Sequence, residues 1–158
     1  MSSLYDVDFY AWTSEQAEVL RKAAHGGSNE PLDFENLAEE IESLGASERR
    51  ELRSQIQRII RHLLKLQYSG AKEPRRRWME SISDARSEIE LVLETSPSLR
   101  RELGAVIIGE TERGSRRAIA DLEKHNEIDP ASAARIRATA YTEEQMLGDW
   151  FPEEPLAR

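Results

Sequence analysis

The sequence of 158 residues contains no cysteine, which excludes disulfides, thiolate metal ligands and cysteine nucleophiles. It also lacks long hydrophobic runs: the longest, at residues 105–108, is far too short to span a membrane. The opening MSSLYDVDFY has neither the basic nor the apolar region of a secretory signal. We therefore expect a cytoplasmic protein that does not enter a membrane.

Glycine is sparse, and no segment alternates apolar and polar residues over the length of a strand. Hydrophobic residues instead recur every three or four positions, as in amphipathic helices. This pattern predicts helices over 7–24, 34–44 and 47–69, after Pro74, from Pro97 to about Asn126, and short ones from Pro130 and Thr142. We expect an all-α fold, an antiparallel helical bundle of four substantial helices with short flanking helices, in a single domain 1–158.

The first predicted helices leave one alternative open and give one definite expectation about burial. Ile41 and Leu52 are eleven residues apart, close to three helical turns, so 34–44 and 47–69 form either two helices or one helix kinked at Gly45. The stripes expected to be buried are Phe9, Trp12, Gln16, Val19 or Leu20, and Ala23 in the first helix, and Leu37, Ile41 and Leu44 in the second.

The sequence also lacks the motifs of common enzyme classes. It contains no phosphate-binding glycine loop and no G-x-S-x-G nucleophile motif. No histidine has a glutamate three residues before it, as the di-metal sites of helical bundles require. Asp121 and His125 have a spacing that suits a shared metal, but a histidine near a helix C-terminus, beside the helix dipole, is the preferred explanation. We predict no catalytic, cofactor-binding or metal-ligating residue.

Charge is distributed unevenly along this acidic chain, whose net charge is −8. Residues 1–45 hold ten acidic and two basic residues, whereas residues 46–80 hold ten basic and four acidic ones. The overall negative charge opposes general attraction to nucleic acid or anionic lipid. The contrast between the two segments favours pairing between them, either within one chain or between chains.

The basic segment ends in GAKEPRRRW, residues 70–78, and Arg75, Arg76 and Arg77 are candidate interaction residues. Four explanations stay open. The arginines are solvated without a role, or dock the acidic and aromatic C-terminal segment 142–158, or bind an acidic surface of another chain, or contact nucleic-acid phosphates. The docking alternative would use Asp149, Glu153, Glu154 and a stacked Trp150.

Tyr10 and Trp150 are the remaining candidate interaction residues. Neither falls clearly in phase with an apolar stripe, unlike Trp12 and Trp78, for which core packing is the first explanation. If the opening DFYAW and the closing DWF segments lie close together, Tyr10 and Trp150 would form an aromatic binding patch.

Several segments in order along the chain resemble the DUF29 family of uncharacterised bacterial helical proteins. They are DFYAW at 8–12, ENLAEEIESLG at 35–45, HLLKLQYS at 62–69, Trp78, SPSL at 96–99 and YTEEQMLGDWFPE at 141–153. The resemblance implies an all-helical fold of bacterial origin. It implies no activity and no functional residues, because the family supplies none.

These observations predict a non-enzymatic protein–protein interaction or accessory module of the bacterial cytoplasm, with a protein partner or self-association. The alternative is a nucleic-acid-associated protein that uses the basic segment 49–77. A second alternative is a metal-dependent enzyme.

Overall fold

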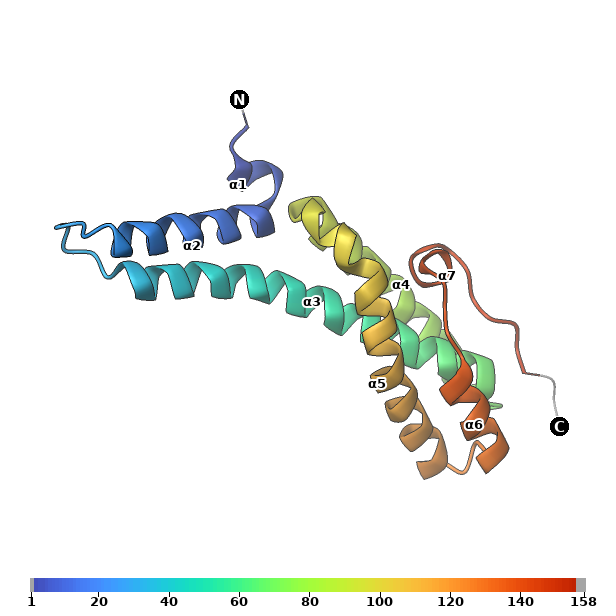
Figure 1. The fold of residues 1–158 in the computed structure, drawn as a ribbon. Coiled ribbons are helices and arrows are strands. Elements are labelled where there is room, and N and C mark those ends of the chain that lie inside the picture. Colours follow the sequence, from blue (N-terminus) through green and yellow to red (C-terminus); the bar gives the residue numbers. More distant parts are fainter. Residues whose placement is uncertain (1, 156–158) are drawn as a thin grey trace. The chain divides into compact units, whose positions relative to one another are not determined.

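The computed structural model describes residues 2–155, and this part of the chain is helical without a β-strand (Figure 1). The all-helical prediction is confirmed, and four of the described helices are substantial. The elements are α1 (Leu4–Val7), α2 (Phe9–His25), α3 (Phe34–Tyr68), α4 (Arg75–Thr95), the 3-10 helix η1 (Pro97–Glu102), α5 (Leu103–Lys124), α6 (Pro130–Ala138) and α7 (Glu143–Leu147). Helix α3 continues through Gly45, so the two predicted segments form one helix.

The helix start expected at Pro97 is wrong in detail, because a 3-10 helix precedes α5. The Ser96 hydroxyl does not cap a helix; it accepts the backbone N–H of Tyr10 at 3.2 Å. Ser98 donates its N–H and its hydroxyl to the carboxylate of Asp8, at 2.6 and 2.9 Å. These bonds to the start of α2 hold the chain after α4 in a tight turn.

The described chain divides into two compact units. Unit 1 contains the residues up to Leu52 together with Glu90–Arg101. Unit 2 contains Arg53–Ile89 and the residues from Glu102 onward. Helices α3 and α4 each contribute residues to both units.

Unit 1 is built on a hairpin in which α2 and the first part of α3 run antiparallel (Figure 1). Small residues line the contact: Thr13 and Ala17 of α2 are buried, as are Ala38 and Gly45 of α3. A Cβ atom on Gly45 would overlap Thr13 Oγ1, so the helices approach closely because Gly45 has no side chain.

The stripe predicted for α3 is therefore wrong at Leu37 and Leu44. In α2 the alternative Val19 is exposed, whereas Leu20 is half-buried, as are Phe9, Trp12, Gln16 and Ala23. Leu37 and Leu44 are 41% and 52% exposed, and Val19 is 52% exposed. Ile41 is half-buried. The helices pack through their small residues because backbones in close contact leave no room for leucine, and the larger side chains are turned to one flank.

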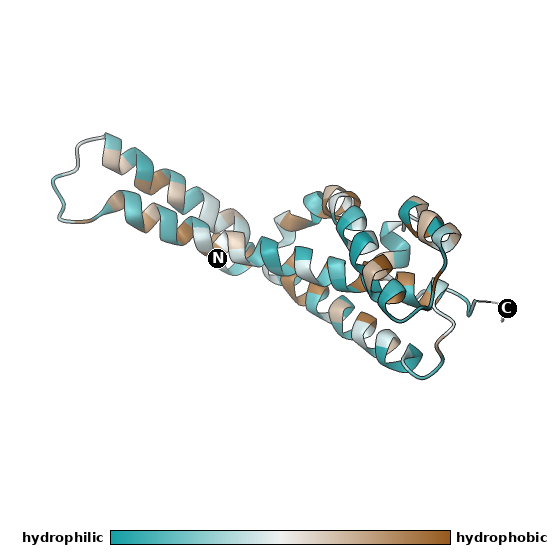
Figure 2. Ribbon diagram, turned by 90° about the horizontal axis from the view of Figure 1, so that it is seen from below, coloured by the Kyte–Doolittle hydropathy of each residue, from teal (hydrophilic) through white to brown (hydrophobic). Residues whose placement is uncertain are grey.

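Unit 2 has the larger hydrophobic core. Figure 2 shows hydrophobic and hydrophilic residues alternating along its long helices. The stripes predicted for the second part of α3 and for α5 are confirmed as buried: Leu52, Ile56, Ile59, Ile60, Leu63, Leu64, Leu103, Val106, Ile107, Ala118 and Leu122. Helices α3 and α5 also approach closely, since a Cβ atom on Gly114 would lie 2.5 Å from Ile60 Cγ2.

Candidate functional site

The three consecutive arginines at the start of α4 have different surroundings. The Arg75 side chain is only 12% exposed: its Nη1 donates to the Leu66 carbonyl at 2.7 Å, and its Nε lies 3.4 Å from Glu154 Oε1. Arg76 is 90% exposed and pairs with Glu80 one turn later. Arg77 is also exposed. Consecutive helical residues point about 100° apart, so the three side chains leave the helix in different directions.

A single arginine that the sequence analysis did not select, Arg86 of α4, holds the C-terminal segment. Its Nε donates to the Met146 carbonyl at 2.9 Å, and its Nη2 donates to the carbonyls of Gln145 and Trp150, at 2.9 and 2.7 Å. The guanidinium also lies 4.9 Å from the centre of the Phe151 ring. Residues 156–158 of the predicted docking segment lie outside the described residues.

Tyr10 and Trp150 belong to different units, and their shared patch stays a prediction. The half-buried Tyr10 is tied to Ser96 through its backbone N–H. Trp150 lies beside Tyr141, with ring centres 6.1 Å apart. The aromatic cluster near the N-terminus instead contains Trp12, whose ring centre is 4.9 Å from that of Tyr5 and 5.9 Å from that of Phe9.

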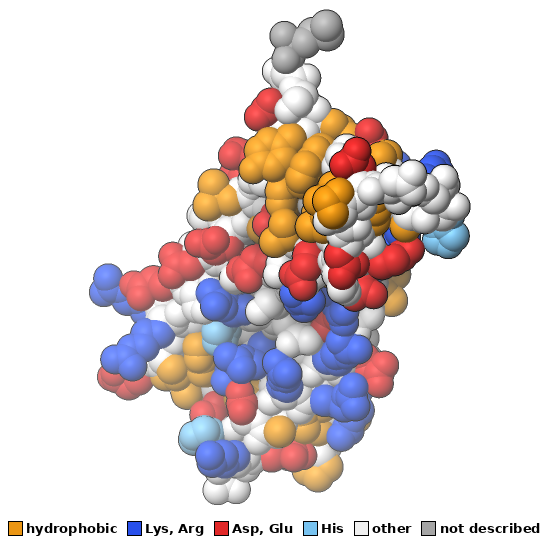
Figure 3. Space-filling model, turned by 90° about the vertical axis from the view of Figure 1, so that its left-hand side faces the viewer, with side chains coloured by type: hydrophobic (Ala, Val, Ile, Leu, Met, Phe, Trp, Pro, Cys, Tyr) orange, Lys and Arg blue, Asp and Glu red, His pale blue; other side chains and the backbone are white. Residues whose placement is uncertain are grey.

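This aromatic cluster continues into the exposed stripes of the hairpin. Trp12 precedes the buried Thr13 by one residue, and Leu44 likewise precedes Gly45. One residue turns a helix by about 100°. In an antiparallel pair, Trp12 and Leu44 therefore lie on the same flank of the hairpin. Val19 follows Trp12 by two turns, and Leu37 precedes Leu44 by two turns. We call this surface the apolar hairpin face: Tyr5, Phe9, Trp12, Val19, Leu37, Ile41 and Leu44. Figure 3 shows hydrophobic side chains gathered near the N-terminal end, with acidic side chains around them.

Unit 2 contains a buried carboxylate, that of Glu110 on α5, which is only 3% exposed. Arg53 donates to Glu110 Oε1 from Nε and Nη2, both at 2.8 Å, and Arg113 Nη1 lies 3.2 Å from the same oxygen. Gln57 donates to the other oxygen. Burial opposes ionisation of Glu110, but the hydrogen bonds from Gln57 and Arg53 and the nearby guanidinium charges outweigh it and hold its pKa below the usual value.

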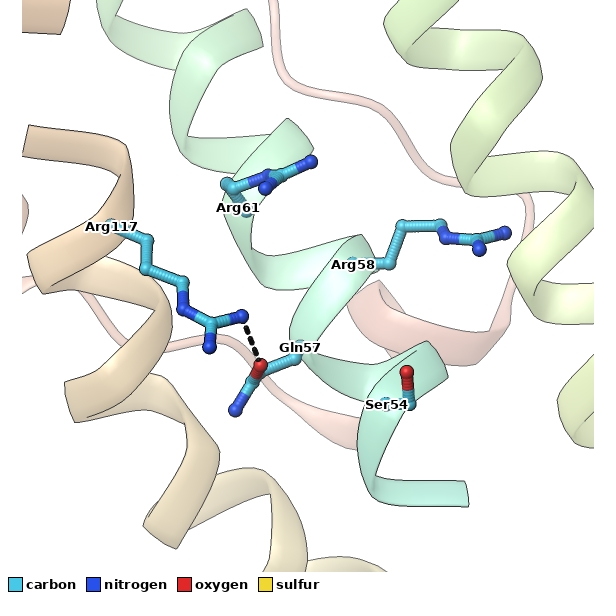
Figure 4. Close-up of a pocket in the computed structure, with 5 residues that line it drawn as sticks. All are labelled: Ser54, Gln57, Arg58, Arg61 and Arg117. Atoms are coloured by element: carbon cyan, nitrogen blue, oxygen red, sulfur yellow. Dashed lines mark hydrogen bonds between the residues drawn. The ribbon is translucent and has the colours of Figure 1, made fainter. Parts of the chain in front are cut away.

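Next to Glu110 lies a pocket of about 150 Å³, lined mainly by arginines (Figure 4). We call it the arginine pocket, and it comprises Ser54, Gln57, Arg58, Arg61 and Arg117. Its α3 residues recur at intervals of three and four, so they form one stripe of that helix. Arg117 reaches in from α5 and donates its Nη1 to Gln57 Oε1 at 2.6 Å.

His62 lies beside this pocket on α3. Burial lowers its pKa to about 4, and the charges of Arg61, Lys65 and Arg58 add to the effect, against opposition from Asp121. The ring is therefore neutral at neutral pH. Burial is the main cause of this low pKa, because it disfavours the charged form of the ring, and the neighbouring cations add to it.

We expect this histidine to make stability depend on pH. The unfolded chain protonates His62 near the ordinary pKa of 6.5, but the folded chain does so only near pH 4. Between these values, acid favours the unfolded state and removes about 2 kcal/mol of stability. Urea unfolding at several pH values measures this loss. His62→Gln should flatten the dependence between pH 6.5 and 4, and an unchanged slope would contradict the assignment.

The spacing of Asp121 and His125 is explained without a metal. The Asp121 carboxylate lies 2.7 Å from Lys65 Nζ, and His125 Nδ1 is 2.7 Å from the Asp121 backbone carbonyl. Across residues 2–155, no group of three or more histidine, aspartate or glutamate side chains is arranged to hold a metal ion. In the same residues, no helix combines the length and the hydrophobicity needed to cross a membrane.

The sequence analysis missed the arginines of α5. Arg113, Arg116 and Arg117 occur in the segment RGSRR, at the spacing of one helical face. That spacing is a sequence signal for a basic face on this helix, on a different side from its apolar stripe. Of the predicted basic segment 49–77, Arg58 and Arg61 line the pocket, whereas Arg53 is bound to Glu110.

Comparisons with known proteins agree with the fold. An alpha-helical protein of unknown function from Rhodospirillum rubrum, known from a crystal structure, superposes with a TM-score of 0.68 at 24% sequence identity; the match covers 96% of this chain and all of the other. At this identity the likeness shows the fold alone. No curated protein matches the sequence. The family model for the domain of unknown function DUF29 matches residues 4–151, nearly the whole chain, and this protein therefore belongs to the DUF29 family.

Proposed function

We propose that the protein is a non-enzymatic interaction module of the bacterial cytoplasm, and that the apolar hairpin face is its docking surface for another protein. The observation that carries the proposal is the exposure of Val19, Leu37 and Leu44 beside the aromatic cluster on one flank of the hairpin. Contiguous apolar surface on a soluble protein is commonly an interaction site. Each square ångström of such surface contributes about 25 cal/mol when a partner covers it.

The partner that fits this face is an amphipathic helix with basic residues beside its apolar stripe. Two neighbouring apolar stripes on an antiparallel helix pair form a surface on which the apolar face of a third helix can pack. Glu15 and Glu40 are exposed and lie, by helical position, along its outer edges. Residues 1–45 as a whole carry ten acidic and two basic residues. A symmetric pair of identical chains would place these acidic edges against each other, which disfavours self-association through this face.

A peptide titration tests the proposal. The probe is a model amphipathic helix with a leucine stripe flanked by lysines, and the comparison peptide has glutamates in place of the lysines. We expect the lysine peptide to bind the wild-type protein and the glutamate peptide not to bind. The double variant Leu37→Ser, Leu44→Ser should weaken binding of the lysine peptide by roughly tenfold or more, because it removes two apolar contacts.

The matched control is Leu91→Ser with Ile108→Ser, since Leu91 and Ile108 are also exposed but lie outside the apolar hairpin face. This variant should bind the lysine peptide as the wild type does. Circular dichroism and thermal unfolding check that both variants stay folded, as expected for exposed positions. Equal weakening by the two variants would overturn the proposal. A concentration-dependent dimer that only Leu37→Ser with Leu44→Ser abolishes would identify a second copy as the occupant instead.

A further inference from the structure

We propose that the arginine pocket of unit 2 binds a phosphate group. The pocket lies in a different unit from the apolar hairpin face, so this proposal does not depend on the proposed docking surface. Three features support the site: arginines without an ion-pairing carboxylate, a buried donor without a partner, and the size of the pocket beside a second arginine-lined hollow.

The acidic groups near the pocket neutralise other cations. The Glu110 carboxylate accepts hydrogen bonds from Arg53 and from the amide of Gln57, and it forms an ion pair with Arg113. Asp121 pairs with Lys65. Among the described residues, Arg58 and Arg61 have no carboxylate within ion-pairing distance, and Arg117 is bound only to the uncharged Gln57. The pocket is therefore lined by three arginines that form no ion pair among the described residues. The charge of Asp121, beyond ion-pairing distance, acts on one of them, Arg61.

Arg61 also has a donor that the protein leaves unused. Its Nε is buried and has no hydrogen-bond partner within the described chain. A buried donor is costly unless an acceptor receives its hydrogen bond. In a pocket lined by cations, the acceptor that fits is an anion. Ser54 supplies a hydroxyl donor at the same surface. Planar guanidinium groups match the oxygen atoms of phosphate, which can accept from several of them at once.

The pocket has room for one phosphate group, and it shares Arg117 with a second hollow on α5. Its volume is about 150 Å³. The second, more open hollow of about 390 Å³ is lined by Arg113, Arg116, Arg117 and Ala120. Arg117 belongs to both hollows, so a ligand with two neighbouring phosphates can occupy both. Such phosphates occur in free compounds such as pyrophosphate and in the backbone of nucleic acids.

Isothermal titration calorimetry of the whole protein tests the site, with inorganic phosphate, pyrophosphate and a single-stranded oligonucleotide as separate probes. We expect Arg58→Gln with Arg61→Gln to lower the affinity for the probe that binds by roughly tenfold or more, because two charge-assisted contacts are lost. The matched control, Arg76→Gln with Arg77→Gln, makes the same change in net charge on exposed residues of α4 and should leave binding unchanged.

The probes distinguish the two sources of phosphate. Binding of pyrophosphate or inorganic phosphate that is lost with Arg58→Gln and Arg61→Gln supports a site for a free phosphate compound. Binding of the oligonucleotide alone, with the same loss and with affinity that falls steeply as salt rises, supports a nucleic-acid backbone. If no probe binds the wild-type protein, the proposal is overturned. It is also overturned if Arg58→Gln with Arg61→Gln weakens binding no more than the control, Arg76→Gln with Arg77→Gln. Because Arg61 is partly buried, Arg58→Gln with Arg117→Gln serves as a second pocket variant and must give the same result.

Discussion

Replacement of Glu110 by alanine is expected to destabilise the protein by about 2 kcal/mol, since it leaves the half-buried Arg53 and Gln57 without their acceptor. The Glu110 carboxylate holds Arg53 and Gln57 of α3 against α5, so its removal breaks a contact between two core helices. Urea or thermal unfolding measures the loss. We expect Glu110→Gln to fall between alanine and the wild type, because the amide keeps one acceptor oxygen but loses the charge.

Glu112→Ala is the control for this effect. Glu112 lies on the same helix, but its side chain is solvent-exposed, and the nearest guanidinium nitrogen, on Arg116, is 4.0 Å away. Exposed pairs of this kind contribute little, so the expected change is within about 0.5 kcal/mol. If Glu110→Ala and Glu112→Ala unfold alike, the buried network does not stabilise unit 2 in the way described.

Gly114→Ala is expected to cost about 2 kcal/mol, although alanine is the better helix former, because the added methyl group overpacks the contact between α3 and α5. Its Cβ atom would lie 2.5 Å from Ile60 Cγ2 and 3.1 Å from Ile60 Cβ, both in the middle of a helix. Ile60 Cβ cannot move away without a shift of the backbone, and moving Cγ2 would force this β-branched side chain out of its preferred rotamer. Chemical denaturation measures the change in the free energy of unfolding.

The same helix provides a control with the opposite sign. A Cβ atom on Gly109 meets nothing within 4 Å, so Gly109→Ala should stabilise the protein by up to about 1 kcal/mol through helix propensity alone. A double-mutant cycle adds a second check: Ile60→Ala removes the Cγ2 atom, so Gly114→Ala should cost less in that background than in the wild type. A Gly114→Ala protein as stable as the wild type would show that the helices are not in close contact here.

The candidate surfaces were only partly predictable from the sequence. The basic segment 49–77 contained Arg58 and Arg61, but it also contained Arg53 and Arg75, which are engaged with Glu110 and with the Leu66 carbonyl. Local sequence does not tell a free arginine from a paired one, because the partners lie on other helices. The apolar hairpin face was visible as hydrophobic stripes, but its exposure was not.

The residue pattern alone is enough to predict that the chain is helical and which residues form the core of unit 2. Large apolar residues that recur every three or four positions, such as those from Ile56 to Leu64, can leave water only on one face of a helix. The pattern does not predict that Gly45 and Ala38, rather than Leu37 and Leu44, are buried in the hairpin, or that Arg117 lines the same pocket as Arg58 and Arg61. Both outcomes depend on how closely two helices approach and at which turn they meet, and those distances are set by packing between segments remote in sequence.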